Sequence, residues 1–262
     1  MKTIYTTKDI NFMKEHYKDM SYRDIAQVLG FTERQIRGKI NGMGLTKNRE
    51  YNKDFFANID SANKAYWLGF IYADGNISNG SVNIEIDSSD EYLLKKFVED
   101  MDSQIKVTQR ERDTTFNGYI YHTHTSLVRI YCKDIANQLI GLGIVPTKTY
   151  RKEYPKCDQF FWHFLRGFLD GDGCLHMDKN NKLVMHFTNP NEAFLQYLQN
   201  KIYNVLSITG KIYKEKEWKY RLYYSNQEDV KTILDMIYDL TNCDIKLERK
   251  YNIYKTFLGF AA

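Results

Sequence analysis

Two aspartates occupy matching places in this chain and have the chemistry to act together. Asp74 and Asp172 each end an apolar stretch, residues 66–74 and 161–172, and each is followed by glycine. Both stretches are apolar on nearly every side, which predicts two buried helices that end at the aspartates. Carboxylates brought together at helix ends repel each other unless they are protonated or share metal ions. Oxygen ligands of this kind suit Mg²⁺, and the predicted chemistry is metal-assisted phosphodiester hydrolysis.

Small residues spaced four apart predict how these two helices meet. Gly69 and Ala73 lie in the first stretch, and Gly167 and Gly171 lie in the second. A stripe of small residues lets two helix backbones come close, so we expect the helices to pack on each other. The glycines after the two aspartates are expected to be C-terminal caps: Gly75 and Gly173.

The sequence repeats itself at the offset of 98 residues that separates Asp74 from Asp172. Three elements occur twice at this offset: an apolar Gly-Phe pair (69–70 and 167–168), the Asp-Gly pair (74–75 and 172–173) and a basic Lys-x-x-Arg-Lys element (148–152 and 246–250). One Asp-Gly pair would more often be only a turn after a buried helix. Two copies in register favour a duplicated functional unit of about one hundred residues.

The repeat predicts an α+β fold, with two αββαββα repeats in a pseudo-two-fold arrangement. In each repeat a helix is followed by two strands, a helix, two strands and a further helix. We expect the repeats to span 60–155 and 156–262. The expected strands include 104–112, 119–132, 211–217 and 219–224, and the expected helices include 90–101, 133–142, 191–206 and 227–240.

The first fifty residues predict a separate helix-turn-helix DNA-binding domain over 1–50. Ala26, Gly30 and Ile36 have the spacing of that motif, in which a small residue, a left-handed turn and an apolar anchor join two helices. The segment holds ten Lys and Arg against six Asp and Glu, whereas the rest of the chain is neutral. A small helical interaction domain with a solvated basic face is the alternative. The expected DNA contacts on the last helix are Arg34, Arg37 and Asn41.

Cations alternate with apolar residues in several of the expected strands. Residues 211–221, for example, hold five cations and two glutamates. A sheet with one face on the core and the other on DNA would have this alternation, and a solvated strand face is the alternative. The expected DNA-contacting cations are Lys106, Arg110, Arg112, Arg129, Lys211, Lys214, Lys216, Lys219 and Arg221.

Composition argues against several other classes. The 262 residues are 43% hydrophobic with a net charge of +4, and they contain no apolar run of the length that spans a membrane. We therefore expect a soluble, cytoplasmic protein that is not secreted and has no membrane partner. The four cysteines form no Cys-x-x-Cys pair, which favours reduced structural thiols over a zinc site.

Residues 68–75 (Leu-Gly-Phe-Ile-Tyr-Ala-Asp-Gly) and 165–173 (Leu-Arg-Gly-Phe-Leu-Asp-Gly-Asp-Gly) resemble the two motifs of single-chain LAGLIDADG homing endonucleases. The resemblance covers roughly residues 60–262. It implies a monomer, acting as a pseudo-dimer, that makes a double-strand break at a long double-stranded DNA target, as in intron homing. In the first motif Tyr72 replaces the usual Asp and Trp67 holds the first position; neither is a metal-ligand position.

The resemblance also assigns roles within the site. The penultimate acidic residue of each motif would bind the catalytic metals, which gives that role to Asp74 and Asp172, helped by the carbonyls of Ala73 and Gly171. The implied cofactor is Mg²⁺, with Mn²⁺ as a substitute and Ca²⁺ binding without cleavage. A basic residue would stand beside each carboxylate and polarise water or stabilise charge on the phosphate. The candidates are Lys148 and Lys246, with Arg151, Lys152, Arg249 and Lys250 as rivals.

Three other functions are known for this fold class. An RNA maturase would assist intron splicing without cutting DNA. A catalytically silent DNA-binding regulator would typically have lost the acidic motif residue, whereas Asp74 and Asp172 are both present. An intein would require splicing residues at its ends, and the chain begins with Met1 and ends Phe260-Ala261-Ala262. The endonuclease is therefore the expected function.

Overall fold

The computed structural model describes residues 4–45, 51–116, 118–146, 153–239 and 243–259. The chain divides into two compact units, Met1–Glu50 and Tyr51–Ala262. Each unit has its own cluster of buried apolar side chains.

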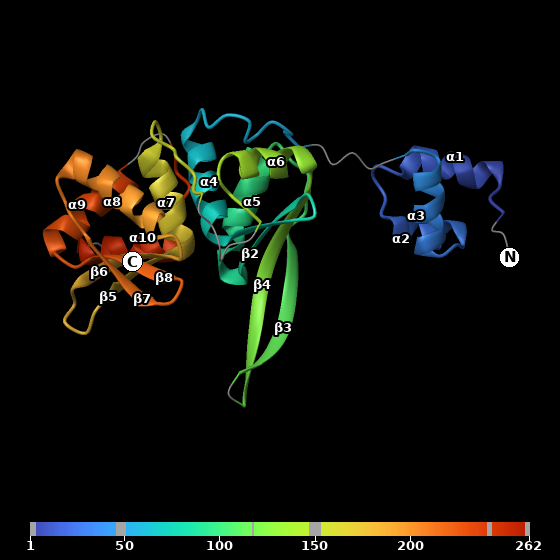
Figure 1. Cartoon of the computed structure of the whole chain (residues 1–262). Coiled ribbons are helices and arrows are strands. Elements are labelled where there is room, and N and C mark those ends of the chain that lie inside the picture. Colours follow the sequence, from blue (N-terminus) through green and yellow to red (C-terminus); the bar gives the residue numbers. More distant parts are fainter. Residues whose placement is uncertain (1–3, 46–50, 117, 147–152, 240–242, 260–262) are drawn as a thin grey trace. The chain divides into compact units, whose positions relative to one another are not determined.

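The first unit contains three short helices, α1 (Thr7–His16), α2 (Tyr22–Leu29) and α3 (Glu33–Gly42) (Figure 1). Each begins at a hydroxyl side chain that accepts a hydrogen bond from the first turn: Thr6, Ser21 and Thr32. Gly30 ends α2 in the left-handed conformation (φ 72°), which glycine adopts without strain. The buried side chains at the centre are Met13, Ile25, Ala26, Ile36 and Ile40.

The second unit contains two αββαββα halves, which confirms the predicted α+β fold. The first half comprises α4 (Ala62–Asp74), β1 (Gly75–Ser78), β2 (Ser81–Asp87), α5 (Glu91–Asp100), β3 (Thr108–Phe116), β4 (Tyr119–Tyr131) and α6 (Lys133–Gly141). The second comprises α7 (Phe161–Asp172), β5 (Gly173–Met177), β6 (Leu183–Asn189), α8 (Glu192–Leu206), β7 (Lys211–Lys216), β8 (Lys219–Tyr224) and α9 (Gln227–Tyr238). Within the described ranges, no helix is both long and apolar enough to cross a membrane.

Each half builds one antiparallel sheet. The strand orders are β1-β2-β4-β3 and β5-β6-β8-β7, so the two sheets have the same topology. The apolar side chains that alternate along β2 and β6 lie on the face that packs against the helices, among them Val82, Ile84, Met185 and Phe187. Both sheets lie on the same side of the unit, below the helices in the view of Figure 1. We call the face of each sheet that points away from the helices its outer face.

Three local predictions differ from the structure. Strand β3 begins at Thr108 rather than 104, because Thr108 is the first residue that pairs with β4. A helix that was not predicted, α10 (Glu248–Phe257), follows α9. Gly75 and Gly173 end their helices, but both are extended (φ −70° and −75°) rather than left-handed. Glycine is required at both places because a Cβ would overlap the preceding turn of the helix.

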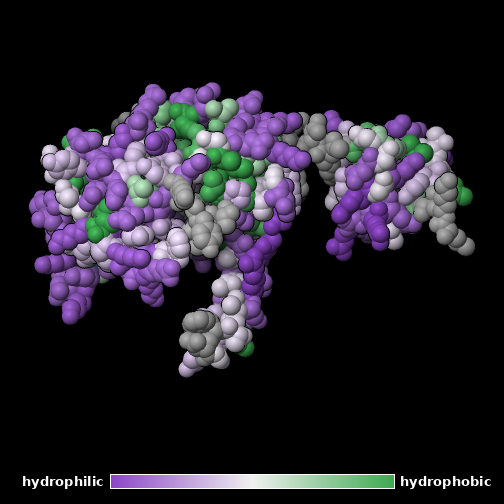
Figure 2. Space-filling model, viewed as in Figure 1, coloured by the Kyte–Doolittle hydropathy of each residue, from purple (hydrophilic) through white to green (hydrophobic). Residues whose placement is uncertain are grey.

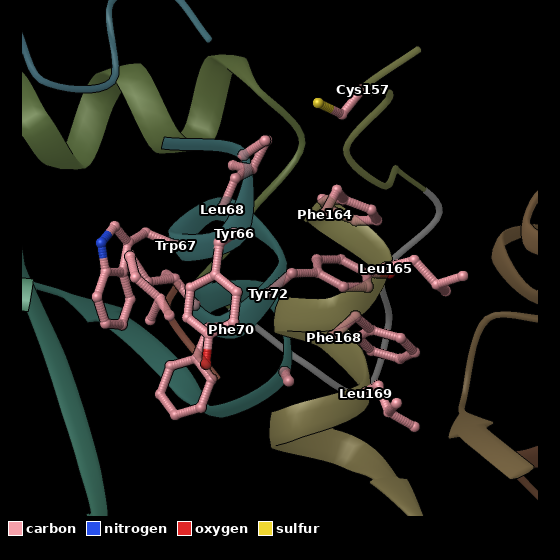
Figure 3. Close-up of a cluster of buried hydrophobic side chains, with 14 of the residues drawn as sticks. Tyr66, Trp67, Leu68, Phe70, Tyr72, Cys157, Phe164, Leu165, Phe168 and Leu169 are labelled. Atoms are coloured by element: carbon pink, nitrogen blue, oxygen red, sulfur yellow. The ribbon is translucent and has the colours of Figure 1, made fainter. Parts of the chain in front are cut away.

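Helices α4 and α7 pack along a seam in which their backbones touch. A Cβ on Gly69 would overlap the carbonyl oxygen of Phe164, and a Cβ on Gly167 would overlap that of Tyr66. Phe164 and Tyr66 are themselves one offset of 98 residues apart, so the seam is nearly two-fold symmetric. Tyr72 of α4 reaches across the seam, and the centre of its ring lies 5.8 Å from that of Phe168 of α7 (Figure 3).

A buried arginine fastens α7 to the C-terminal part of the unit. Arg166 is 1% exposed, and its guanidinium donates hydrogen bonds to the carbonyl oxygens of Cys243 (2.7 Å) and Ile237 (3.4 Å). One of its nitrogens lies 3.5 Å from Nδ1 of His163. Burial and the adjacent Arg166 charge lower the pKa of His163 from 6.5 to about 4. His163 is therefore neutral in the folded protein at neutral pH.

We predict that Gly167→Ala destabilises the protein by at least about 2 kcal/mol, because the new methyl group must push the backbones of α4 and α7 apart. Gly141→Ala is the control, since Gly141 ends α6 and a Cβ there meets no atom within 4 Å. Chemical denaturation followed by circular dichroism measures both. Equal stability of the two variants would contradict the close approach at the seam.

We also predict that the neutral His163 makes the fold sensitive to acid. The folded state binds fewer protons than the unfolded state between pH 6.5 and about 4, so the free energy of unfolding falls as the pH falls through this range. Relative to His163→Gln, which cannot titrate, the wild type should lose roughly 2 kcal/mol more. Denaturation curves at a series of pH values test this, and parallel curves for both proteins would refute it.

Candidate functional site

Asp74 and Asp172 are the last residues of the two seam helices. Asp74 is half-buried and Asp172 is exposed. Ala73 packs against Gly171 at this end of the seam, and a Cβ built on Gly171 would lie 3.2 Å from Oδ2 of Asp74. The carboxylate of one helix therefore lies beside the last turn of the other, which is the juxtaposition that the spacing of small residues predicts.

An acidic cavity of about 240 Å³ opens beside Asp74. Carboxylates from both halves of the unit line it, together with one arginine: Asp74, Glu85, Asp87, Asp90, Asp170 and Arg249. Arg249 is held by an ion pair in which its Nε lies 3.0 Å from Oδ2 of Asp90. The carboxylates outnumber the cation, so the field inside the cavity favours a positively charged ligand.

Lys250 lies against the end of α7 that carries Asp172, and it is only 4% exposed. Its ammonium group donates hydrogen bonds to four carbonyl oxygens: those of Leu169 (2.6 Å), Asp170 (2.8 Å), Gly171 (3.5 Å) and Gly173 (2.5 Å). Burial lowers the pKa of Lys250 from 10.5 to about 8, and the nearby charges of Asp170 and Asp74 oppose this shift. A cation in this place is stabilised by the partial negative charge of the helix end.

Asp170, two residues before Asp172, links the end of α7 by hydrogen bonds to α4 and to the start of α10. Its Oδ2 accepts hydrogen bonds from the Tyr66 hydroxyl of α4 (2.8 Å) and from the backbone N–H of Leu247 at the start of α10 (2.8 Å). Burial raises the pKa of Asp170 to about 6. Tyr72 holds the matching position of the first motif, so the two helix ends are supported differently. No role was predicted for Asp170, although its place in the second motif was the available signal.

Lys246 and Lys250, which the sequence left as rivals, lie in different surroundings. The Lys246 ammonium lies 3.6 Å from a carboxylate oxygen of Glu248 and 4.8 Å from the centre of the Tyr251 ring. Lys246 lines a separate pocket beside α5 and does not line the cavity next to Asp74. Of the two, Lys250 is the one that contacts a seam helix. Arg249, a further candidate, lines the cavity beside Asp74 and is paired with Asp90. The remaining basic candidates lie outside the described residues: Lys148, Arg151 and Lys152.

The outer face of the first sheet carries the predicted arginines. Cross-strand pairing places Arg110 opposite Thr125 and Arg129 opposite Asn83. Arg112 is two residues beyond Arg110 and shares its face, because side chains alternate along a strand. The Arg129 guanidinium donates a 2.5 Å hydrogen bond to Asn83. Lys106 is exposed but precedes β3, so it is not on the sheet as predicted.

The second sheet has a similar outer face. Arg221 pairs with Thr188 on β6 and with Tyr213 on β7, and Lys211 pairs with Tyr223. Lys216 pairs with Lys219 at the end of the hairpin, beyond an irregularity after Lys214. Lys214 differs from the prediction: it pairs with Tyr220, which alternates with the outer-face Arg221, so Lys214 lies on the other face of the hairpin.

The first unit presents its predicted polar residues on α3. Arg34, Arg37 and Asn41 are all exposed. Arg37 forms an ion pair with Glu33 at 2.5 Å, and its guanidinium lies 5.8 Å from the centre of the Tyr22 ring. These side chains are available on one exposed helix surface.

The donor set at the seam fits Mg²⁺ better than a softer metal. The groups gathered there are the carboxylates of Asp74 and Asp172 and the carbonyls of the last helical turns, all hard oxygen ligands. Among the described residues, no cluster of three or more His, Cys, Asp and Glu side chains could enclose a metal by itself. Such an open set suits a metal that keeps water and substrate oxygens among its ligands.

Comparison with protein-family models finds the same fold in both halves. Residues 162–238 match the model of the LAGLIDADG-like domain, and residues 63–123 match that of the WhiA LAGLIDADG-like domain. No curated protein sequence matches the chain. The second unit is thus made of LAGLIDADG-like domains.

Solved structures agree with this fold. The homing endonuclease I-WcaI bound to its DNA recognition sequence gives a TM-score of 0.53 at 17% identity, covering 86% of this chain and 99% of that one. The I-LtrWI LAGLIDADG homing endonuclease bound to target DNA gives 0.50 at 11% identity, covering 79% and 91%. Full-length DUF199/WhiA from Thermatoga maritima gives 0.48 at 13% identity, covering 79% and 64%.

Proposed function

We propose that this protein is a site-specific, metal-dependent DNA endonuclease that makes a double-strand break in a long target. The observation that carries the proposal is the pair of Asp-Gly helix ends, Asp74 and Asp172, which α4 and α7 bring to one end of a shared seam. Two such ends provide one acidic group for each strand of a duplex. Intron homing, in which the enzyme cuts an uninterrupted copy of its host site, is the biological role that we propose for this activity.

Mg²⁺ is the cofactor that we propose, and Mn²⁺ is a suitable substitute. Asp74 and Asp172 would hold it, with the backbone carbonyls of Ala73 and Gly171. When bound, it would activate water and stabilise charge on the leaving 3′ oxygen. Ca²⁺, with its larger and more flexible coordination, would bind at the same carboxylates without supporting cleavage.

The protein's own groups would orient the reacting atoms. The glycine seam fixes the separation of the two helix ends, so the carboxylates are positioned before substrate binds. The Lys250 ammonium holds the end of α7 through four carbonyls and would supply positive charge at this helix end, where negative charge would develop on phosphate. We therefore favour Lys250 over Lys246 as the basic residue of the second half. The roles of Lys148 and Lys246 remain predictions.

Double-stranded DNA is the partner that we propose. The outer faces of the two sheets lie on one side of the unit, as do the DNA-binding strands expected for this fold (Figure 1). Both similar endonuclease structures are complexes with DNA. The first unit would be a helix-turn-helix domain that adds a separate contact through the exposed face of α3. Phosphate contacts from both units would make binding strongly salt-dependent.

A catalytically silent DNA-binding protein is the second candidate. The observation that favours it is the match of residues 63–123 to the WhiA LAGLIDADG-like domain rather than to an endonuclease model. Both motif aspartates are nevertheless present, which favours cleavage.

We predict that Asp74→Asn and Asp172→Asn each reduce double-strand cleavage by at least about 100-fold, because each removes a charge at the reacting centre. DNA affinity should change little, since the cations of the outer faces are untouched. Substrate is obtained by incubating a plasmid library of randomised inserts with the wild type and Mg²⁺ and recovering linear products. Asp113→Asn, on the exposed β3–β4 ribbon, is the control and should cut normally. Undiminished cutting by both site variants would exclude the proposed active site.

A second prediction separates the two lysines. Lys250→Met should lower the cleavage rate by about 100-fold while DNA affinity, measured in Ca²⁺, stays close to that of the wild type. Lys246→Met should cut at the wild-type rate, because its amine is paired with Glu248 away from the acidic cavity. Thermal unfolding of both variants checks that folding is not the cause. The opposite ranking would assign the role to Lys246.

A further inference from the structure

The two faces of the β3–β4 ribbon carry different charges. This ribbon projects from the rest of the second unit as a narrow arm (Figure 2). On the outer face, Arg110 and Arg112 lie between Thr108 and Thr114, and the two arginines are opposite threonines of β4. On the other face, Glu111 pairs with His124, and Asp113 pairs with His122. The acids of β3 are therefore kept off the outer face.

Glu85, on β2, places a carboxylate among the outer-face arginines. Its carboxylate oxygens lie 3.5 Å from the Arg110 guanidinium and 3.0 Å from that of Arg112. The Thr125 hydroxyl of the intervening strand β4 donates a 2.7 Å hydrogen bond to it. The Glu85 side chain is 28% exposed and that of Arg112 is 52% exposed. One carboxylate thus holds two arginines on a surface that solvent can reach.

The second sheet also has one glutamate that pairs with two cations, but at positions that the 98-residue offset does not relate to those of the first sheet. Glu215 on β7 lies 3.2 Å from the Lys219 ammonium and 2.7 Å from the Arg221 guanidinium, both on β8. In each sheet, then, one glutamate bridges two cations that are two residues apart on another strand: across β4 in the first sheet and on the adjacent strand in the second. The offset of 98 residues takes Glu85 to Leu183 on β6, not to Glu215. The duplication therefore does not account for the second glutamate.

We propose that Glu85 and Glu215 are specificity-determining residues of the outer faces. Each offsets the charge of two cations and fixes where their donors point, so the surface attracts DNA of arbitrary sequence less strongly. A DNA phosphate can bind these cations only in competition with the glutamate. A base edge whose acceptors match the N–H groups that the glutamate has oriented can bind them while the glutamate stays in place. The proposal rests on the proposed function, in that it requires DNA on the outer faces.

Glu85→Gln tests the proposal, and Glu111→Gln is its matched control. Both remove one negative charge from the same part of the sheet, but Glu111 is on the opposite face of the ribbon. The probe is a labelled random-sequence duplex, titrated with protein over a range of KCl concentrations. Glu85 also lines the cavity beside Asp74. Binding is therefore measured in EDTA, which removes divalent metal ions, so that a change in metal binding cannot alter the measured DNA affinity.

For Glu85→Gln we expect the plot of log affinity against log salt to steepen by about one, and random-duplex affinity to rise about fivefold to tenfold at roughly 0.1 M KCl. Affinity for a target recovered from a cleaved library should rise less, so the ratio of target to random affinity falls. Glu111→Gln should differ from the wild type by less than about twofold. Glu215→Gln should behave as Glu85→Gln does.

Glu85→Asp is a control for structural disturbance at this position that is unrelated to charge. It keeps the charge, so its salt dependence should match that of the wild type, even if the shorter side chain shifts the arginines. Equal effects of Glu85→Gln and Glu111→Gln would overturn the proposal and leave the endonuclease assignment intact. A wild-type protein that binds no duplex even at low salt would instead overturn the proposed function itself.

Discussion

The close contact between the α4 and α7 backbones governs the geometry of the whole second unit. Gly69 and Gly167 allow the helices to touch where any side chain would overlap a carbonyl oxygen. Because Gly69 and Gly167 leave no side chain at the points of closest approach, the bulky residues of both helices lie around the seam, where they form one continuous apolar core for the two halves. Each helix then leads directly into the first strand of a sheet. The seam thereby fixes the positions of the shared core, two sheets and two carboxylates at once.

The chemistry at the end of the seam is asymmetric, although the backbone there is nearly symmetric. Asp170 and Lys250 bind the end of α7 to α10 and to Tyr66 of the other half, and no Asp occupies the matching place in α4. Burial moves the pKa values of these two groups toward each other, to about 6 and about 8. The Lys250 ammonium donates to backbone carbonyls of the last turn of α7, and the Asp170 carboxylate accepts from Tyr66 and Leu247. Moving this helix end would therefore leave several buried polar groups without hydrogen bonds, which is costly.

Much of this arrangement could be predicted from sequence, because it depends on residue types at regular spacings. The apolar helices, the alternating strands and the 98-residue repeat predicted the fold, and small residues four apart predicted the seam. Other features depend on contacts between distant segments and were not predictable. Lys250 could be told apart from Lys246 only once α10 was placed against α7. The irregularity after Lys214 brings Lys216 opposite Lys219, whereas Lys214, three residues from Lys211, lies on the other face by simple alternation. The extended conformation of Gly75 and Gly173 likewise depends on pairing, because each is the first residue of a strand and pairs with the next one, Gly75 with Ile84 and Gly173 with Phe187.

The β3–β4 ribbon makes the two halves unequal in reach. Strand β3 has nine residues and its counterpart β7 has six, and at the usual rise per residue this difference extends the first ribbon by roughly 10 Å. That length corresponds to about three base pairs along a duplex axis. The two repeats of this chain therefore present strand ribbons of different length. For the endonuclease that we propose, a cut at the centre of pseudo-symmetry would divide the recognised sequence into a longer and a shorter part, so a palindromic target would not be its best match.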